Sequence, residues 1–311
     1  MTATTGIIAA LCIAGASPAV AADPADDPSA LEMIETATPG SENAEVLAVL
    51  ENVGMEDYVA AIPARDTLVT IPVDATSGLA LDQGGDVVTI GLPNASQAAP
   101  GVADEDGLVH FDNGDGSTTV PIVREDGVVQ ITTLIEGPSA PKRYEYPMTV
   151  ADGGQLVDAG DGFFAILDAV GQPVAMIDPA RAKDADGRDV PTRYEQQEDT
   201  LVQIVEHGTD FTYPIVADPA VRGNLITGVA YPSSPYGIVV SVTPRSGWAI
   251  TPFENWWAEY KLWVASWYEG NKFYNQLRCH VDVAPFKSPW NLDAWRPDVS
   301  YSNVLAAACN P

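Results

Sequence analysis

The feature that most constrains the fold is a series of short, β-branched segments between residues 66 and 222. Turn dipeptides separate them, and Asp-Gly supplies the positive φ values that tight hairpins require. The expected turn pairs are Asp106-Gly107, Asp126-Gly127, Asp161-Gly162 and Asp186-Gly187. The expected strand segments are LVTIPV, DVVTIGL, STTVPIV, GVVQITTLI, YEYPMTV, FFAILDA, TLVQIVE and FTYPIV. Many short strands predict an antiparallel sandwich, barrel or extended meander. The lack of a βαβ rhythm disfavours Rossmann and TIM-barrel enzymes.

The first 22 residues have the pattern of a signal peptide. Gly6 to Ala16 is apolar but too short to span a bilayer, and small residues follow at Ala19 to Ala22. No Lys or Arg precedes the apolar run. We therefore expect a secreted, extracellular protein, and no later stretch is apolar enough to predict a membrane span.

Two segments separate the signal peptide from the strands. Residues 23–40 are rich in Asp, Pro and small residues, which predicts a disordered leader. Residues 41–65 are expected to be helical, because Val46, Leu47, Leu50 and Val53 follow helical spacing.

Charge and aromatic residues divide the remaining chain into two parts. The net charge is −28, but from Gly223 onward six acidic residues balance six basic ones. All seven tryptophans lie between Trp248 and Trp295. We therefore expect a β-rich domain over 66–222 and a Trp-rich α+β end module over 223–311. The excess negative charge disfavours nucleic acid as a partner.

The end module should begin with strands near 225–231 and 237–243, followed by a helix. Thr251, Pro252 and Glu254 fit a capping box, and Gly270 fits the helix end. Trp256, Tyr260, Trp263 and Trp267 would then share one helical face. Residues 273–283 fit a helix or a strand, and we favour the helix. A short helix from Ser302 should close the chain.

Two cysteines remain once the signal peptide is removed. Outside the cell, Cys279 and Cys309 should be oxidised to each other. A disulfide across a loop of about 30 residues stabilises by roughly 3–4 kcal/mol in the chain-entropy model.

The end of the chain resembles a known family. Asn275 to His280, Trp290 to Asp293, and the terminal Cys309-Asn310-Pro311 look like the signature of domain of unknown function 2599. The resemblance covers roughly the final 85 residues and implies a secreted actinobacterial protein, without implying an activity. Asp293 stands where Glu is more usual. More loosely, the region from Tyr194 to Pro219 resembles a β-rich segment that precedes varied C-terminal modules, which implies a carrier or spacer role.

Most enzyme chemistries are disfavoured by the residues present. The chain has three histidines and no Gly-x-Ser-x-Gly, and a disulfide-bonded Cys279 has no thiolate. Cys279, His280 and Asp282 invite comparison with secreted phospholipase A2, in which His and Asp are adjacent. Here they are not adjacent, and the glycine-rich calcium loop is absent. The acidic turns do not place Asp or Glu at the positions that an EF-hand calcium loop requires. His280 and Asp282 would point in different directions on a helix, which disfavours a zinc site. We expect no metal and no cofactor.

His280 is the strongest catalytic candidate, with Asp282 or Asp293 as its carboxylate partner. Lys287, Asn291 and Arg296 could complete a small polar site around it. The alternative is that the His280 ring bonds a backbone carbonyl inside a tight core, while Asn291 and Arg296 tie down loops.

The tryptophans could form a core or stack on sugar rings. Trp248 and Trp257 lie off the main stripe and are the expected exposed ones. The leading hypothesis is a secreted, non-catalytic binding or interaction protein, with a cell-envelope component or extracellular protein as its partner. The alternative is a small secreted hydrolase or toxin-like effector that uses His280.

Overall fold

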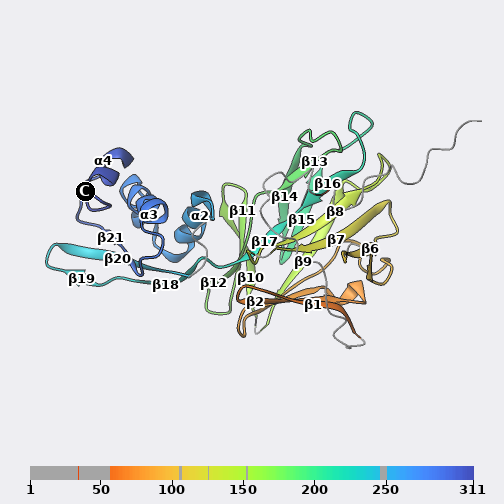
Figure 1. The fold of residues 1–311 in the computed structure, drawn as a ribbon, viewed down its shortest axis with the longest axis horizontal. Helices are drawn as coiled ribbons and strands as arrows, with labels where there is room; N and C mark the ends of the chain where they lie inside the picture. Colours follow the sequence, from red (N-terminus) through yellow and green to blue (C-terminus); the bar gives the residue numbers. More distant parts are fainter. Residues whose placement is uncertain (1–33, 35–56, 105–106, 125, 152, 246–250) are drawn as a thin grey trace, which may run out of the picture.

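The computed structural model describes residues 34, 57–104, 107–124, 126–151, 153–245 and 251–311 (Figure 1). Two antiparallel β sheets make up one end of the elongated molecule, and a smaller module of three helices and a third sheet makes up the other (Figure 1). The expected class, mainly antiparallel β with a small disulfide-closed α+β end module, is confirmed.

The first sheet has seven strands in the order β1-β2-β3-β4-β9-β15-β14. Their bounds are β1 Tyr58–Ala64, β2 Thr67–Pro72, β3 Leu79–Asp82, β4 Val87–Ile90, β9 Arg143–Val150, β14 Thr192–Gln197 and β15 Thr200–Val205. A 3₁₀ turn, η1 at Ala75–Ser77, lies between β2 and β3.

The second sheet has ten strands, with β10-β11-β12-β17-β8-β7-β6-β5 as its main path and β16 joining β8 to β13. Their bounds are β5 Val102–Ala103, β6 Val109–Asp112, β7 Ser117–Val123, β8 Val129–Ile135, β10 Gln155–Gly160, β11 Phe163–Leu167, β12 Pro173–Ile177, β13 Arg181–Lys183, β16 Ile215–Asp218 and β17 Ala220–Gly223.

One aliphatic core joins the two sheets. It contains Val69 and Leu81 of the first sheet together with Ile131 and Ile177 of the second, all at most 1% exposed. β8 is buried at all seven positions because it is central in its sheet and covered on both faces. The eight expected strand segments all contain strands, and the arrangement is that of two packed sheets.

The hairpin between β10 and β11 shows why the Asp-Gly pairs predicted turns. Asp161 and Gly162 have φ values of 54° and 83°. Both central residues of this turn therefore take the left-handed conformation that Asp and Gly tolerate best.

One prediction for the N-terminal region needs correction. The helical segment was expected to reach residue 65, but Tyr58–Ala64 is strand β1, whose burial alternates because Ala60, Ile62 and Ala64 face the core. Residues 41–56 lie outside the described residues. In the expected leader, Ile34 is 3% exposed and packs in an apolar cluster with residues of the second sheet, namely Leu108, Val120, Ile122, Leu134 and Val216.

The end module combines four strands with three helices. The strands are β18 Ile226–Ala230, β19 Ser233–Ser234, β20 Gly237–Pro244 and β21 Trp290–Asp293. The helical elements are α2 Phe253–Trp263, η2 Ser266–Tyr268, α3 Asn271–Val283 and α4 Tyr301–Ala306. The helical interpretation of 273–283 and the closing helix are confirmed, whereas strand β21, which pairs with β20, was not expected.

Helix α2 differs from its prediction at both ends. Pro252 is the N-cap residue and no side-chain cap bond forms there, so the expected capping box is absent. The helix ends at Trp263 rather than near Gly270, because Val264 is extended and Tyr268 turns back to accept a hydrogen bond from the Tyr260 hydroxyl at 3.0 Å. Trp256 and Tyr260 lie in the core, but Trp267 is on η2 and 74% exposed.

A buried ionic cluster joins the β sheets to the end module. Glu259 of α2 is fully buried, and its carboxylate accepts the backbone N–H groups of Leu225 and Ile226. Arg222 of β17 lies 3.5 Å from Glu259 and 3.3 Å from Asp178. Because Arg222 is 1% exposed, these contacts place charge pairs, rather than a solvated hinge, at this junction.

Among the described residues, none of the helices combines the length and apolar character needed to cross a bilayer.

Candidate functional site

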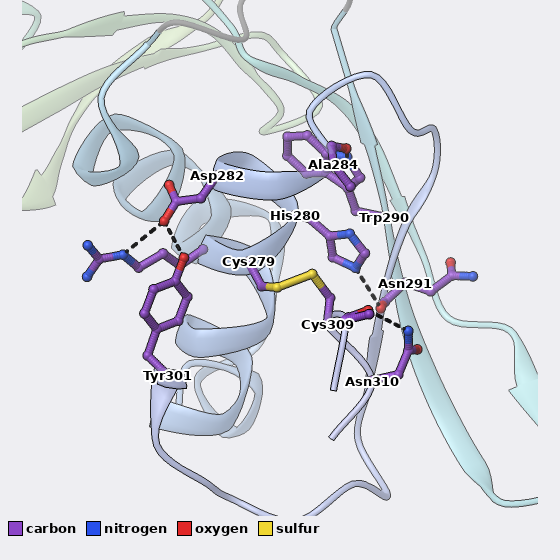
Figure 2. The surroundings of a disulfide bond; sticks show 11 residues. Cys279, His280, Asp282, Ala284, Trp290, Asn291, Tyr301, Cys309 and Asn310 are labelled. Atoms are coloured by element: carbon purple, nitrogen blue, oxygen red, sulfur yellow. Dashed lines mark hydrogen bonds and ion pairs between the residues drawn. A yellow bond between two sulfur atoms is a disulfide. The ribbon is translucent and has the colours of Figure 1, made fainter. Parts of the chain in front are cut away.

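The expected disulfide is the covalent frame of the candidate site. Cys279 on α3 and Cys309 after α4 are joined by an S–S bond of 2.04 Å, with their Cα atoms 5.6 Å apart (Figure 2). Ala308 and Cys309 have φ values of 49° and 65°, so the chain turns sharply after α4 to bring the sulfur back to α3. Of the residues singled out, His280 and Asp282 lie on the helix that this disulfide fastens to the tail of the chain.

His280 lies inside the module rather than in a cleft. Its side chain is 3% exposed, its Nε2 is 3.3 Å from the backbone oxygen of Asn291, and its ring stacks on Trp290 with centroids 6.1 Å apart. Burial lowers the pKa of His280. A neutral ring with Nε2–H donating to the carbonyl fits these contacts, and it leaves Nδ1 buried without a hydrogen-bond partner among the described residues.

Both candidate carboxylates bond groups other than His280. Figure 2 shows Asp282 and His280 on different sides of α3, as a separation of two residues on a helix requires. Asp282 accepts hydrogen bonds from the Tyr301 hydroxyl and from Arg278. Asp293 is 2.6 Å from Nε of Arg296. Among the described residues, neither carboxylate is therefore hydrogen-bonded to the His280 ring, although the Asp293 charge acts on it.

The polar residues expected around His280 have separate structural contacts. The Asn291 side chain accepts a hydrogen bond from Ser241 at 3.0 Å, across the β20–β21 pair. Lys287 is exposed in the loop between α3 and β21. Arg296 donates to the Pro311 carbonyl at 2.8 Å and to Asn310 at 3.2 Å. Arg296 thus fastens the tail of the chain, as the structural alternative proposed.

The other two histidines also have local partners. His207 is buried between the Tyr213 hydroxyl and the Pro141 carbonyl, each 2.9 Å away. His110 lies 2.5 Å from Asp104 at the β5–β6 edge of the second sheet. Among the described residues, no group of three or more His, Cys, Asp or Glu side chains could hold a metal ion.

Of the two tryptophans expected to be exposed, the structure describes only Trp257. Trp257 is half-buried, stacked on Tyr260 with centroids 5.3 Å apart and edge-on to Tyr274 at 5.1 Å. Trp248 lies outside the described residues. Trp256 and Trp290 pack together at 4.9 Å as the centre of the module's core.

An exposed aromatic pair was missed by the sequence reasoning. Tyr236, in the turn between β19 and β20, is 73% exposed, and its ring centroid is 5.0 Å from that of Trp295, which is 39% exposed. The Arg296 guanidinium lies over Trp295 at 4.4 Å. We call Tyr236, Trp295 and Arg296 the hairpin-tip cluster. The signal for it was the Pro-Tyr-Gly turn, which presents an aromatic ring where no core can cover it.

Gly237 makes the close packing of this cluster possible. Its φ is 140°, and a Cβ at this position would lie 3.3 Å from Cβ of Trp295. A side chain here would therefore be strained and would push Trp295 away.

Comparison with known proteins adds one match. No curated protein and no solved structure matches the chain. One family model does match the last part of the chain, from Tyr236 onward. This part contains the hairpin-tip cluster, the disulfide, His280 and helices α2 to α4. Residues 236–311 match the family described as "Protein of unknown function (DUF2599)".

Proposed function

We propose that the chain is a secreted, non-catalytic binding protein whose end module makes the contact. The observation that carries this proposal is the contrast between a buried His280 and an exposed aromatic pair, 3% against 73% at Tyr236. A general base must reach a substrate proton, whereas a binding surface needs exposed rings held in fixed positions.

Three features support an extracellular location. Residues 1–22 have a signal-peptide pattern, and two cysteines are left after its removal. These two are joined in a disulfide, with their Cα atoms 5.6 Å apart. Disulfides persist in oxidising compartments and are rare in the cytosol.

The contacts of the candidate acid–base residues support a non-catalytic role. A general base must lie within hydrogen-bond reach of the substrate proton that it abstracts, directly or through one water. His280 instead bonds a backbone carbonyl. Asp282 bonds Tyr301 and Arg278, and Asp293 bonds Arg296. The His280 and Tyr301 bonds join α3 to β21 and to α4, while the two arginine pairs are local contacts.

The test is a pull-down of the full mature chain against cell-envelope fractions, compared with a His280→Gln variant. We expect capture of a component by both proteins, because glutamine keeps a donor for the Asn291 carbonyl and His280 does not face the surface. The proposal is wrong if the wild type captures nothing. It is also wrong if the wild type consumes an envelope component and the His280→Gln variant does not.

A further inference from the structure

The Trp295 and Arg296 part of the hairpin-tip cluster is fastened by several contacts, and the exposed Tyr236 ring packs against Trp295. Arg296 is fixed by Asp293, Asn310 and the Pro311 carbonyl, and its guanidinium covers the Trp295 ring. Gly237 packs against the base of Trp295. A ring fixed in this way loses little conformational freedom when a ligand binds, which favours binding.

The polar edges of the two rings are available to a ligand. Among the described residues, neither the Tyr236 hydroxyl nor the Trp295 indole N–H has a hydrogen-bond partner. Aromatic rings of this kind offer an apolar face beside a polar edge. A pyranose with equatorial hydroxyls is complementary, because it presents C–H bonds on its faces and hydroxyls around its rim.

Charge and surroundings favour an uncharged ligand with many hydroxyl groups. The charge of Arg296 is matched by Asp293, 2.6 Å away, and the whole end module balances six acidic with six basic residues. Ser233 and Pro235 beside Tyr236, and Pro297 beside Arg296, are exposed, so short and weakly apolar side chains border the rings. A protein-binding hot spot would instead have a broader apolar surround that excludes water.

The cluster also lies where a large ligand could reach it. β19 and the adjoining turn of β20 form the end of the molecule farthest from the two large sheets (Figure 1). The acidic β-rich region is therefore remote from a polymer bound at this tip.

From these observations we propose that the hairpin-tip cluster binds an uncharged pyranose chain, with Tyr236 as the stacking face and the Trp295 N–H and Tyr236 hydroxyl as polar contacts. This inference rests on the proposed binding function and names its ligand class.

The test uses the full mature chain with two probes, cellohexaose and the hexamer of N-acetylglucosamine, measured by isothermal titration calorimetry. We expect saturable binding of at least one hexamer. Tyr236→Ala should weaken it about tenfold or more, the effect typical of a binding hot spot. Tyr236→Phe and Trp295→Phe should each weaken it by less, because each keeps a ring and removes one polar contact.

Trp267→Ala is the matched control, because Trp267 is 74% exposed, as Tyr236 is, but lies on η2. Its affinity should equal that of the wild type. Failure of both hexamers to bind overturns the saccharide assignment, as does equal loss in Tyr236→Ala and Trp267→Ala. Capture of an envelope component that survives glycan digestion would also overturn it, while leaving the binding function standing.

Discussion

The two regions of this molecule use their acidic residues in different ways. In the β-rich region, many aspartates accept hydrogen bonds from backbone N–H groups of their own turns; these are Asp74, Asp82, Asp104, Asp112, Asp115, Asp126, Asp158, Asp168 and Asp184. In the end module, Glu259, Asp282 and Asp293 lie beside arginines. These nine aspartates of the β-rich region therefore serve their turns, whereas in the end module Glu259 and Asp282 join separate elements and Asp293 pairs with Arg296 three residues away.

The cores differ as well. The core between the two large sheets is mostly aliphatic, while the smaller end-module core contains Phe253, Trp256, Tyr260, Phe273 and Trp290. A small module has little interior, so large rings supply most of the apolar area that it buries. Because all seven tryptophans lie between 248 and 295, tryptophan fluorescence reports the end module alone.

The largest effect should come from the ionic cluster that joins the two regions. Glu259→Ala leaves Arg222 buried without this partner and removes the acceptor for two backbone N–H groups, so unfolding should become easier by about 3–5 kcal/mol. Urea unfolding followed by tryptophan fluorescence measures the change. Glu254→Ala, at an exposed position of the same helix, is the control and should be close to neutral. A neutral Glu259→Ala would contradict a stabilising role for this ionic cluster.

Removal of the disulfide should act on the end module only. The double variant Cys279→Ser, Cys309→Ser should lose roughly 3–4 kcal/mol from the fluorescence-detected transition, because the unfolded tail is no longer constrained. The far-UV circular dichroism transition of the β sheets is the internal control. A matching loss in that transition would show that the disulfide supports both regions.

Acidification should destabilise the end module through buried His280 and stabilise the β-rich region through buried Asp218. Burial lowers the folded-state pKa of His280, so the unfolded chain binds the proton more readily and the end module loses stability as the pH falls below about 6.5. His280→Gln should remove this part of the pH dependence of the fluorescence-detected transition.

Asp218 should have the opposite effect on the pH dependence of stability. Burial raises its folded-state pKa to about 6, above the 3.8 of an unperturbed aspartate. Its contribution is therefore fully present below pH 3.8 and is lost as the pH rises through 6. Asp218→Asn should remove it from the circular dichroism transition between pH 4 and 7. The same slope in the wild type and the variant would contradict this assignment.

The smallest effect is expected at Asp168, where two substitutions distinguish the role of the negative charge from that of the hydrogen-bond acceptor. Asp168 accepts N–H bonds from Val170 and Gln172 in the turn between β11 and β12. Asp168→Asn keeps an acceptor and should be near neutral, while Asp168→Ala should cost about 1 kcal/mol. Thermal unfolding of the two variants decides the comparison, and equal losses would indicate that the negative charge itself matters.

Local patterns in the sequence predicted the strands well, because β-branched alternation and Asp-Gly turns act within a few residues. Patterns that depend on tertiary contacts were harder to interpret. Tyr58–Ala64 contains apolar residues whose spacing suits a helical turn as well as a strand, and pairing with Thr67–Pro72 decides it. Helix α2 stops early because Tyr268 packs on Tyr231 and Phe273, which the helical spacing could not reveal.

The candidate site was predicted only in part. The two cysteines left after the signal peptide identified the disulfide, and the offset of two residues between His280 and Asp282 already indicated that they diverge. The burial of His280 follows from its stacking on Trp290 of β21, a strand that was not predicted. Exposure of Tyr236 likewise depends on where the β19–β20 hairpin lies in the module.

The junction at Glu259 has a practical consequence for protein production. A polypeptide trimmed to the matched segment 236–311 would lack Leu225, Ile226 and the whole of β18. One edge of β20 would lose its neighbour, and the Glu259 carboxylate would lose the N–H groups that bind it. Such unpaired edges promote aggregation, so insolubility of that fragment would reflect where it was cut rather than any instability of the module.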